Sequence, residues 1–556
     1  MPAAKVAGAQ GALPDEEWWA QDVKPRRSKG AGSSETVNGV SVGAVLVSTS
    51  DLTLGDAKMN RRVDVAVIGA GHAGLNAIKE IRKVTDNYVL INGGQLGTTC
   101  ARIGCMPSKV ALHLAETHNN RAHGSKVGIE DGEDIRVDTA QTMERIRDLR
   151  DMFVDLILAN TTDDMGDKLI EGYAELEDTH TIRVGHQTIH TGATVIATGA
   201  RSFVPPEWRL FEDGVLTVET LFDQETLPES IAVLGLGPMG IELAQALHGL
   251  GVRVVGVEQG DTIARINDPI VNKMAIEIMA RDFPLWLGAG VCIERQGDRF
   301  RVRSGERETE VEKLLVAVGR HPNLGGLGLD RFGVTTDRQG VPEYHPQTMQ
   351  VGHLPIYIAG DAAGGLSTLQ RAADQGRIAG YNAARGDATA FKPKTNMSIV
   401  FCNPNVASVG ARWSDLDPEA IAVGQVRFGP VGRAVITGRN RGILRLYADK
   451  RSGHILGAAM VGAQCEHLAH LVAWAVEAGM TVTEALRMPY YHPVYEEAIQ
   501  DALYDLDRHL NGTGSSMVQF ERLDPVAPAP APTHGPGFLA PLHSARAWGQ
   551  RLFLGR

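Results

Sequence analysis

Two short runs of apolar residues, each ending in a glycine-rich turn, give the chain a repeated pattern. The first run, VDVAVIG at 63–69, leads through GAGHAG into a helical pattern, LNAIKEIRKV, and then into a second apolar run, NYVLIN. The same order returns at 231–258 with IAVLG, GLGPMG, IELAQALHGLG and VRVVGVE. A buried strand, a glycine turn, a helix and a second strand form the βαβ unit that binds a dinucleotide. The pattern therefore predicts an α/β protein with two such units.

Each predicted unit is followed by strand-like segments that end on a similar phrase. The first closes on TVIATGAR at 194–201 and the second on LLVAVGRHP at 314–322. A single glycine fingerprint is a weak signal, because ordinary turns also contain glycine. Two fingerprints, each between a strand and a helix and each with a matching closing strand, indicate two nucleotide sites.

Composition narrows the class of protein. The 556 residues correspond to roughly three or four domains, and 55 Lys and Arg against 66 Asp and Glu give a net charge of −11. Such an acidic chain without a long basic block is a poor binder of nucleic acid. No apolar run approaches the ~18 residues of a membrane span, and the N-terminus lacks the apolar segment of a secretory signal. We therefore expect a cytoplasmic protein. Its five cysteines do not make a disulfide scaffold, and no metal site is expected.

The glycines of the two turns have distinct tasks. In this fingerprint the first glycine makes the tight turn, the second lets the pyrophosphate approach the backbone, and the third lets the helix pack on the strand. The helix N-terminus then supplies free N–H groups to the phosphates. These glycines are Gly69, Gly71 and Gly74 in the first unit and Gly235, Gly237 and Gly240 in the second.

An acidic residue that binds the ribose is expected about 20 residues after the first glycine. In the second unit this residue is Glu258, at the end of VRVVGVE. Its carboxylate accepts hydrogen bonds from ribose hydroxyls and repels a 2′-phosphate, so NAD is favoured over NADP. The first unit has Asn92 at the same offset, which can bond a hydroxyl without charge.

The first unit runs into GTTCARIGCMPSK, which contains Cys100 and Cys105. Residues five apart on a regular helix are displaced by about 7.5 Å along its axis, which exceeds the reach of a disulfide. A bridge would need an irregular first turn, for which Gly104 supplies freedom. Two nearby cysteines in an intracellular protein are usually unpaired buried thiols. Their position shortly after a dinucleotide fingerprint favours a catalytic redox role here.

The segment GTTCARIGCMPSK closely resembles the redox-active segment of the pyridine nucleotide–disulfide oxidoreductases. The resemblance continues through ATGAR, the second fingerprint, AVGRHPN, YIAGDAAG and FCNPNVASVG, and it closes with YYHPVYEEAIQDAL. It covers about 63–510. Within this family the chain looks most like the dihydrolipoyl dehydrogenases.

The resemblance implies FAD at the first fingerprint and NAD at the second. Asp361 would hydrogen-bond the ribityl chain of the flavin, and Lys109 and Glu242 would form an ion pair where flavin and nicotinamide meet. Thr99 and Lys109 would lie against the isoalloxazine ring. The further cofactor residues are Gly172, Thr198, Gly199 and Gly319, beside Asn92 and Glu258, which the spacing already indicated.

The resemblance also implies an acid–base pair and a second subunit. His492 and Glu497 match the HPxxxE signature, although Val494 stands where Thr is usual. In this family the histidine reaches the disulfide of the other subunit, so the active site requires a homodimer. Dihydrolipoamide, free or on a separate lipoyl-carrying protein, would attack Cys100 with His492 as base and leave Cys105 as a thiolate against the flavin. Hydride would then pass to NAD+.

The expected architecture has two Rossmann-like dinucleotide-binding domains and a C-terminal α+β dimerisation domain. The expected boundaries are 1–60 for an N-terminal extension, 61–204 with 335–390 for the FAD domain, 205–334 for the NAD domain, 391–511 for the dimerisation domain and 512–556 for a Pro/Ala-rich tail.

Three alternatives stay open. A mercuric reductase would carry a C-terminal pair of adjacent cysteines, and no cysteine follows Cys465. A glutathione reductase typically uses NADP with arginines after the second strand, where this chain has Glu258-Gln259-Gly260. A non-enzymatic flavoprotein subunit would not need the intact set of cysteines, histidine and glutamate. The segment Leu369-Gln370-Arg371, which replaces the usual Ala-His, also leaves room for another disulfide or thiol substrate.

Overall fold

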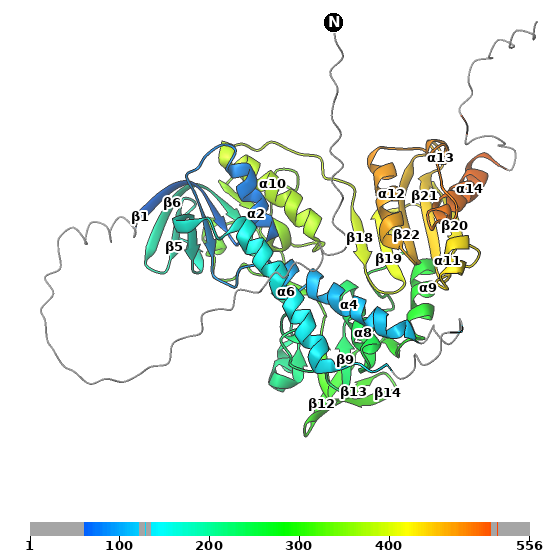
Figure 1. Cartoon of the computed structure of the whole chain (residues 1–556). Helices are drawn as coiled ribbons and strands as arrows, with labels where there is room; N and C mark the ends of the chain where they lie inside the picture. The colour runs from blue at the N-terminus through cyan, green and yellow to red at the C-terminus, as the bar shows by residue number, and fades with distance from the viewer. Residues whose placement is uncertain (1–59, 122–127, 129–134, 513–519, 521–556) are drawn as a thin grey trace, which may run out of the picture.

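The structure is a computed structural model that describes residues 60–121, 128, 135–512 and 520. The expected N-terminal extension and C-terminal tail therefore lie almost wholly outside the described residues. The described chain forms two βαβ-based domains and a C-terminal sheet covered by helices (Figure 1). The predicted fold class, with two Rossmann-like domains and a C-terminal α+β domain, is confirmed. None of the described helices is both long and apolar enough to cross a membrane.

The first sheet grows around the first apolar run. Its strand order is β3-β2-β1-β6-β5-β4, and β17 pairs with β6. The strands are β1 (Asn60–Ile68), β2 (Tyr88–Asn92), β3 (Leu169–Glu171), β4 (Ala174–Leu176), β5 (Thr181–Val184), β6 (Gln187–Ile196) and β17 (Ile356–Ile358). The pairs around β1, β2, β6 and β17 are parallel, whereas β4, β5 and β6 pair antiparallel.

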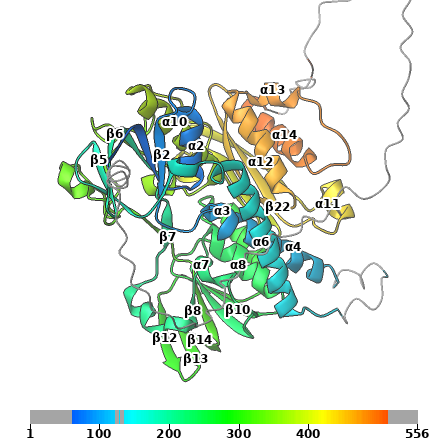
Figure 2. The same ribbon diagram turned by 60° about the vertical axis from the view of Figure 1, so that its left-hand side comes forward.

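Alternation along β1 gives this sheet two buried faces. Val65 and Val67 pack under α2 (His72–Ile81) and α10 (Leu369–Arg385), which lie side by side in both views (Figure 1, Figure 2). Ala66 and Ile68 point to the opposite face and join the hydrophobic cluster of β4 and β5. Because successive side chains of a strand point to opposite faces, a continuous apolar run is what a strand covered on both sides requires.

The second sheet repeats this design. Its order is β11-β10-β9-β15-β8, all parallel. The strands are β8 (Val215–Leu216), β9 (Ser230–Leu234), β10 (Arg253–Glu258), β11 (Leu285–Leu287) and β15 (Lys313–Val316). One face is covered by a three-stranded antiparallel sheet, formed by β12 (Val291–Gln296), β13 (Arg299–Ser304) and β14 (Arg307–Val311). This small sheet lies below β8 and β10 in Figure 2. The helices α8 (Pro238–Gly249) and α9 (Pro269–Met279) belong to the other face.

A two-stranded ribbon marks where the chain crosses between the two domains. It consists of β7 (Ala200–Ser202) and β16 (Arg320–Pro322), which pair antiparallel. β7 follows the last long strand of the first sheet, and β16 follows β15 of the second. The ribbon is thus the double crossover through which the chain enters and leaves the second domain.

The C-terminal domain is built on an antiparallel sheet with the order β18-β19-β22-β21-β20. Its strands are β18 (Met397–Val400), β19 (Asn405–Gly410), β20 (Ile421–Arg427), β21 (Ile443–Asp449) and β22 (Ile455–Gly462). The helices of this domain are α11 (Gly432–Ile436), α12 (Cys465–Glu477), α13 (Val482–Leu486) and α14 (Glu497–Asn511). All four contribute buried side chains to one hydrophobic cluster with the sheet.

The remaining helices connect these parts. They are α3 (Thr99–Arg102), α4 (Cys105–Asn119), α6 (Thr139–Thr161) and α7 (Val218–Leu221), with 3-10 helices at η3 (Gly166–Lys168), η4 (Pro206–Gly214), η5 (Leu329–Phe332), η6 (Gly360–Ala363) and η7 (Trp413–Asp415). α4 packs against both α6 and α8, so the helix that starts at Cys105 joins the first domain to the second.

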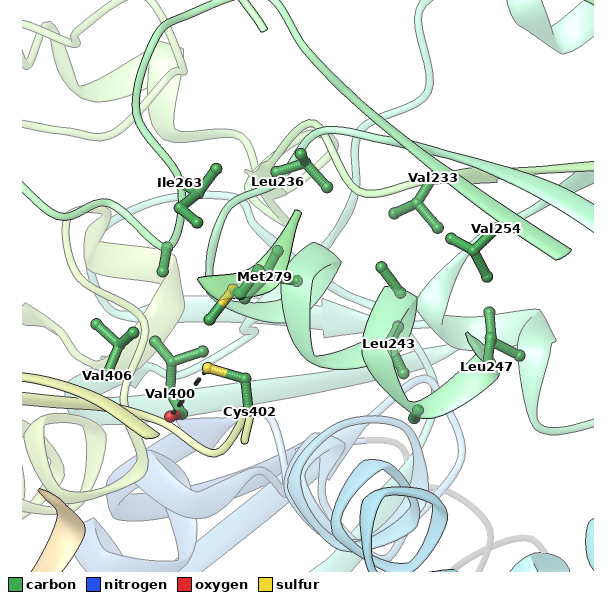
Figure 3. Close-up of a cluster of buried hydrophobic side chains, with 14 of the residues drawn as sticks. Val233, Leu236, Leu243, Leu247, Val254, Ile263, Met279, Val400, Cys402 and Val406 are labelled. Atoms are coloured by element: carbon green, nitrogen blue, oxygen red, sulfur yellow. Dashed lines mark hydrogen bonds between the residues drawn. The ribbon is translucent and has the colours of Figure 1, made fainter. Parts of the chain in front are cut away.

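One hydrophobic cluster runs from the second domain into the C-terminal sheet. Leu236, Leu243 and Met279 share it with Val400 and Cys402 (Figure 3). Cys402 is fully buried, and burial raises the pKa of its thiol above the usual range. This continuous core fixes the C-terminal sheet against the second domain.

A buried ion pair reinforces the same contact. Asp268 is fully buried and caps α9, where its Oδ1 accepts the N–H of Ile270 at 2.9 Å and of Val271 at 3.1 Å. Its Oδ2 lies 2.5 Å from Nη1 of Arg445 and accepts the hydroxyl of Tyr447 at 2.6 Å. Removing one partner of such a pair leaves a buried charge without compensation.

We predict that Asp268→Ala destabilises the protein by about 3–5 kcal/mol, the usual cost of breaking a buried ion pair from one side. The urea midpoint of unfolding, followed by tryptophan fluorescence, should fall accordingly. Asp415→Ala, which removes an exposed ion pair with Arg412, is the matched control and should leave the midpoint unchanged. Equal midpoints for the two variants would contradict this prediction.

Candidate active site

The first and third glycines of both turns have no room for a side chain. A Cβ on Gly69, whose φ is +109°, would lie 2.3 Å from the carbonyl oxygen of Ala197, and one on Gly74 would lie 2.0 Å from that of Gly69. The same clashes recur at Gly235 and Gly240, at 2.6 Å and 1.9 Å from carbonyl oxygens. Both turns are therefore as tight as the fingerprint requires.

The second glycines face space, and the helices that follow them have free ends. Gly71 and Gly237 are the N-caps of α2 and α8, and neither helix has a side-chain cap or an acidic residue in its first turn. A Cβ on Gly237 would meet no atom within 4 Å. Uncapped N–H groups at such an end bind anions such as a pyrophosphate. The residues present fit a dinucleotide at each of the two turns.

The expected ribose anchors hold the turns in the same way in both units. Oδ1 of Asn92 accepts the N–H of Ala70 at 3.1 Å, and Oε2 of Glu258 accepts the N–H of Leu236 at 2.8 Å. Oε1 of Glu258 also accepts the N–H of Gly260 at 3.2 Å. An amide can therefore replace the carboxylate in supporting the turn, whereas the negative charge is present only in the second unit.

The other residues predicted to line the cofactors lie at the ends of strands. A Cβ on Gly172 would lie 2.6 Å from the side chain of Val184, and Gly199 and Gly319 have φ of +69° and +137°. The hydroxyl oxygen of Thr198 is buried without a hydrogen-bond partner among the described residues. A buried polar atom without a partner fits a site that a ligand completes.

The two cysteines lie on either side of a break between helices. Thr99 begins α3, which ends at Arg102, and Cys105 begins α4 after Gly104, whose φ and ψ are −104° and −97°. The irregular turn that a bridge would need is therefore present at the glycine where the sequence suggested it. Both cysteines are free thiols in this structure and half-buried.

The two thiols differ in their pKa, so one of them is the more readily deprotonated. The hydrogen bond from Cys100, helped by the charge of Lys109 and opposed by burial, lowers the pKa of Cys105 to about 7. The same hydrogen bond, together with burial, raises the pKa of Cys100 well above its usual range. A lowered pKa is typical of a thiol that acts as a thiolate or as a leaving group.

Lys109 and Glu242 meet as the sequence predicted, although they are 133 positions apart. Lys109 Nζ lies 2.7 Å from Oε2 of Glu242, which is almost fully buried. The N–H of Phe401 donates to the other oxygen of Glu242 at 2.7 Å, and Lys109 Nζ lies 4.8 Å from the centre of the Phe401 ring. The pair thus joins α4, α8 and the start of the C-terminal domain beside the cysteines.

We predict that the thiolate absorbance of the reduced protein titrates with an apparent pKa near 7, rising as the pH rises through that value, because Cys105 is the more acidic thiol. An ultraviolet absorbance titration measures it. Lys109→Met should move the transition to higher pH, since a nearby positive charge is lost. Cys292→Ser, at an exposed cysteine, should leave it in place, and a single transition near 9 would contradict the prediction.

His492 and Glu497 form a hydrogen-bonded pair at the start of α14. His492 Nδ1 lies 2.8 Å from Oε1 of Glu497, and the N–H of Val494 donates to the other carboxylate oxygen at 3.1 Å. The hydrogen bond from His492 lowers the pKa of Glu497. The imidazole is 76% exposed, and within the described chain no hydrogen bond or ion pair joins it to Cys100 or Cys105. Within one chain, therefore, the two cysteines lie beside Lys109 and Glu242, whereas His492 and Glu497 form a second group that does not bond to the cysteines.

Two contacts near the site were not predicted from the sequence. Gln245 of α8 donates to the carbonyl oxygen of Asn403 at 2.6 Å and accepts the N–H of the same residue at 2.5 Å. Arg320 Nε lies 3.8 Å from the carboxylate of Asp361. Both contacts join residues far apart in the chain, and Arg320 showed only as the residue after Gly319 in the AVGRHPN phrase. No local pattern identifies their partners.

Comparisons with known proteins agree with this geometry. The family model for pyridine nucleotide-disulphide oxidoreductase matches residues 63–376, and the model for the dimerisation domain of the same family matches residues 397–503. A dihydrolipoyl dehydrogenase of Halobacterium salinarum is 30% identical over 79% of this chain and 95% of its own length. A mercuric reductase of Bacillus cereus is 27% identical over 83% of this chain and 74% of its own length.

Solved structures show the same fold. The HOCl-induced flavoprotein disulfide reductase RclA from Escherichia coli matches with a TM-score of 0.68 at 23% identity, over 80% of this chain and 99% of its own. LpdA from Mycobacterium tuberculosis matches with a TM-score of 0.70 at 25% identity over the same shares.

Two uncapped dinucleotide turns and a cysteine pair beside a lysine define a flavin- and nicotinamide-dependent oxidoreductase with a disulfide redox centre. The chain belongs to the pyridine nucleotide-disulphide oxidoreductase family, and it carries that family's dimerisation domain. Its cofactors are FAD and NAD(P), as the sequence predicted.

Proposed function

We propose that the chain is a dihydrolipoyl dehydrogenase, which oxidises dihydrolipoamide through the Cys100–Cys105 disulfide and reduces NAD+. The observation that carries this proposal is the pair of cysteines at the break between α3 and α4, beside the Lys109–Glu242 ion pair. Dihydrolipoyl dehydrogenases among the relatives, of which one is 29% identical over 95% of its own length, support the choice of substrate.

The proposed reaction begins with thiol–disulfide exchange. His492 takes the proton of one substrate thiol, and the thiolate attacks Sγ of Cys100, which forms a mixed disulfide and releases Cys105 as a thiolate. The nearby charge of Lys109 stabilises the Cys105 thiolate that leaves. The second substrate thiol loses its proton and attacks the substrate sulfur of the mixed disulfide. Lipoamide and the Cys100 thiolate result. When bound at the first turn, FAD would supply the acceptor for the electron pair of the dithiol and the hydride chemistry that reduces NAD+.

We further propose that the protein works as a homodimer in which the partner subunit's His492 serves Cys100. The exposed imidazole, held by Glu497 but without a bond to the cysteines of its own chain, supports this arrangement. Glu497 orients the ring and stabilises the imidazolium that forms when the proton arrives.

The division of labour between the domains is part of the same proposal. FAD would lie at the first turn with Asp361, Thr99 and Gly172, and NAD at the second turn with Gly319. We propose NAD rather than NADP, since the carboxylate of Glu258 ends β10 and would repel a 2′-phosphate. The cytoplasmic location expected from the sequence stays a prediction.

A second candidate is a reductase of another disulfide or thiol substrate. The mercuric reductase of Bacillus cereus among the relatives favours it, although this chain has no cysteine after Cys465. At the segment that departs from the family pattern, Arg371 donates to the carbonyl oxygens of Gly364 at 2.8 Å and Leu366 at 3.1 Å. These bonds tie the start of α10 to the turn that follows Asp361.

The test is NADH formation by the yellow holoenzyme from dihydrolipoamide and NAD+. Parallel reactions use NADP+ in place of NAD+, and glutathione disulfide or Hg²⁺ with NADH or NADPH. We expect fast NADH formation from dihydrolipoamide and NAD+, and slow turnover in each of the parallel reactions. A flavin that NADH reduces but dihydrolipoamide does not would reject the lipoyl proposal and direct the search to other disulfides.

A further inference from the structure

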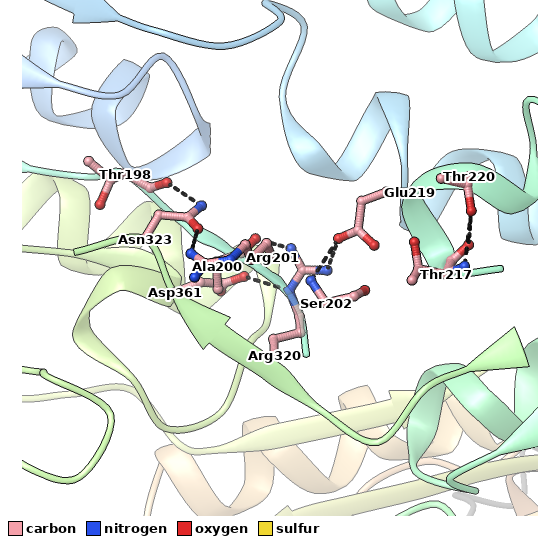
Figure 4. A network of polar contacts seen from close by, with 10 residues as sticks. All are labelled: Thr198, Ala200, Arg201, Ser202, Thr217, Glu219, Thr220, Arg320, Asn323 and Asp361. Atoms are coloured by element: carbon pink, nitrogen blue, oxygen red, sulfur yellow. Dashed lines mark hydrogen bonds and ion pairs between the residues drawn. The ribbon is translucent and has the colours of Figure 1, made fainter. Parts of the chain in front are cut away.

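The ribbon at the double crossover carries a half-buried polar network that lies against Asp361. Arg320 of β16 stands at its centre, between Glu219 of α7 and Asp361 of the turn at η6 (Figure 4). Arg320 pairs with Ser202 across the ribbon. The network therefore contains residues from both dinucleotide-binding domains and from the strands that join them.

The guanidinium of Arg320 contacts three separate parts of the chain. Nη1 lies 3.3 Å from Oε1 of Glu219, Nη2 donates to the carbonyl oxygen of Ala200, and Nε lies 3.8 Å from Oδ2 of Asp361. Oε1 of Glu219 also accepts the N–H of Ser202 at 3.0 Å. A rigid planar guanidinium is suited to holding several acceptors at fixed angles. A lysine has one point charge and would reach fewer of them.

Three atoms of this network are buried without a hydrogen-bond partner among the described residues. They are Nε of Arg320, Oε2 of Glu219 and the hydroxyl oxygen of Thr198. Buried polar atoms are normally paired, and Nε of Arg320 is the atom that faces Asp361. One of the atoms without a hydrogen-bond partner therefore lies on the side of the network where the flavin is proposed to bind.

We infer that Arg320 is a positioning residue for the flavin site, which fixes the carboxylate of Asp361 against the second domain through Glu219. The inference rests on the proposal that Asp361 holds the flavin. Because the same guanidinium bonds the crossover at Ala200 and the second domain at Glu219, the placement of the NAD domain and the orientation of Asp361 depend on one side chain. Loss of Arg320 should therefore loosen FAD and misplace the nicotinamide together.

The test compares Arg320→Met with Arg201→Met in the full-length holoenzyme. Arg201 is exposed on the same ribbon and bonds only Asn323 in this network, so its variant loses the same charge. The readout is the dissociation constant of FAD, measured by the recovery of flavin fluorescence on dilution. We expect a rise of about tenfold for Arg320→Met, the cost of one charge-assisted contact, and less than twofold for Arg201→Met. A constant within twofold of wild type in both variants would overturn the inference.

Two further variants separate the inference from the proposal beneath it. Asp361→Asn should weaken FAD binding if that residue holds the flavin, and an unchanged constant would reject that assignment. Weak binding in Asp361→Asn with normal binding in Arg320→Met would reject the role of Arg320 alone. If Arg320→Met does not fold, Arg320→Lys serves in its place. The FAD dissociation constant should then rise by a few fold, because the lysine ammonium can keep only one of the contacts of the guanidinium.

A double-variant cycle tests the coupling through Glu219. Because Glu219 acts on the flavin only through Arg320, Glu219→Gln added to Arg320→Met should change the FAD dissociation constant no further. The circular dichroism of the bound flavin should change in Arg320→Met and stay as in wild type in Arg201→Met, since it reports how the ring is held. Additive effects of Glu219 and Arg320, with an unchanged flavin spectrum, would leave both as structural residues only.

Discussion

Replacing Cys105 by serine is expected to lower the turnover of dihydrolipoamide at least about a thousandfold, as loss of a covalently acting residue usually does. Serine cannot form the disulfide, so the dithiol has no bond to attack and its electron pair has no way into the protein. NADH formation measures the loss. FAD should stay bound, because Cys105 contributes nothing to the glycine turns.

The matched control is Cys292→Ser. Cys292 is exposed on β12 and lies outside the site, so its variant should keep wild-type turnover. NADH-dependent reduction of a one-electron dye, which bypasses the disulfide, should survive in both variants. Turnover of dihydrolipoamide by Cys105→Ser at a wild-type rate would show that the cysteine pair is not the entry point for electrons.

Replacing His492 by glutamine is expected to slow dithiol turnover by about 10²- to 10⁴-fold, the usual contribution of a general base. Glutamine preserves a hydrogen bond to Glu497 but cannot take a proton from the substrate thiol. His470→Gln, at an exposed histidine on α12, is the control. The dye reaction with NADH should be unaffected. A loss of both reactions in His492→Gln would indicate damage to the fold instead of loss of the base.

Hybrid dimers test which subunit supplies the base. A mixture of His492→Gln and Cys100→Ser subunits that exchange freely should recover about a quarter of wild-type turnover, because half of the dimers are hybrid and each hybrid has one intact site. Recovery requires the histidine and the cysteine of one site to come from different chains. No recovery after verified subunit exchange would place His492 and Cys100 in the same subunit.

The sequence was most informative where a feature is local. The apolar runs at 63–69 and 231–234 predicted two buried strands, and in the structure both strands contribute side chains to hydrophobic clusters on two faces of their sheet. The glycine fingerprints predicted two tight turns. At Gly74 and Gly240 the clash that forbids a Cβ is local, because it is with the carbonyl oxygen of the first glycine of the same turn. Gly104 likewise indicated an irregular turn, and in the structure it lies at the break between α3 and α4, between Cys100 and Cys105.

Contacts between distant residues were beyond sequence reasoning unless a resemblance identified both partners. Lys109 and Glu242 were anticipated because each lies in a recognisable phrase. Asp268 and Arg445 lie in no such phrase, and nothing local distinguishes a carboxylate that is buried against an arginine 177 positions away from one on the surface. The three-stranded sheet β12–β14 was not foreseen as a unit either, because its register depends on the face of the second sheet that it covers.

The exchange of the cysteine pair with a lipoyl disulfide is the central claim, and trapping it is the most direct test. In Cys105→Ser the Cys100 thiolate can attack the disulfide of oxidised lipoamide and form a mixed disulfide. An acid quench protonates the freed substrate thiol, which keeps that thiol from closing the lipoyl ring again and preserves the adduct. Mass spectrometry of the intact subunit, followed by peptide mapping, should find one lipoamide added to Cys100, with none added in the Cys100→Ser/Cys105→Ser double variant. A flavin-loaded Cys105→Ser protein that gains no lipoamide, or gains it at Cys292 alone, would contradict the claim.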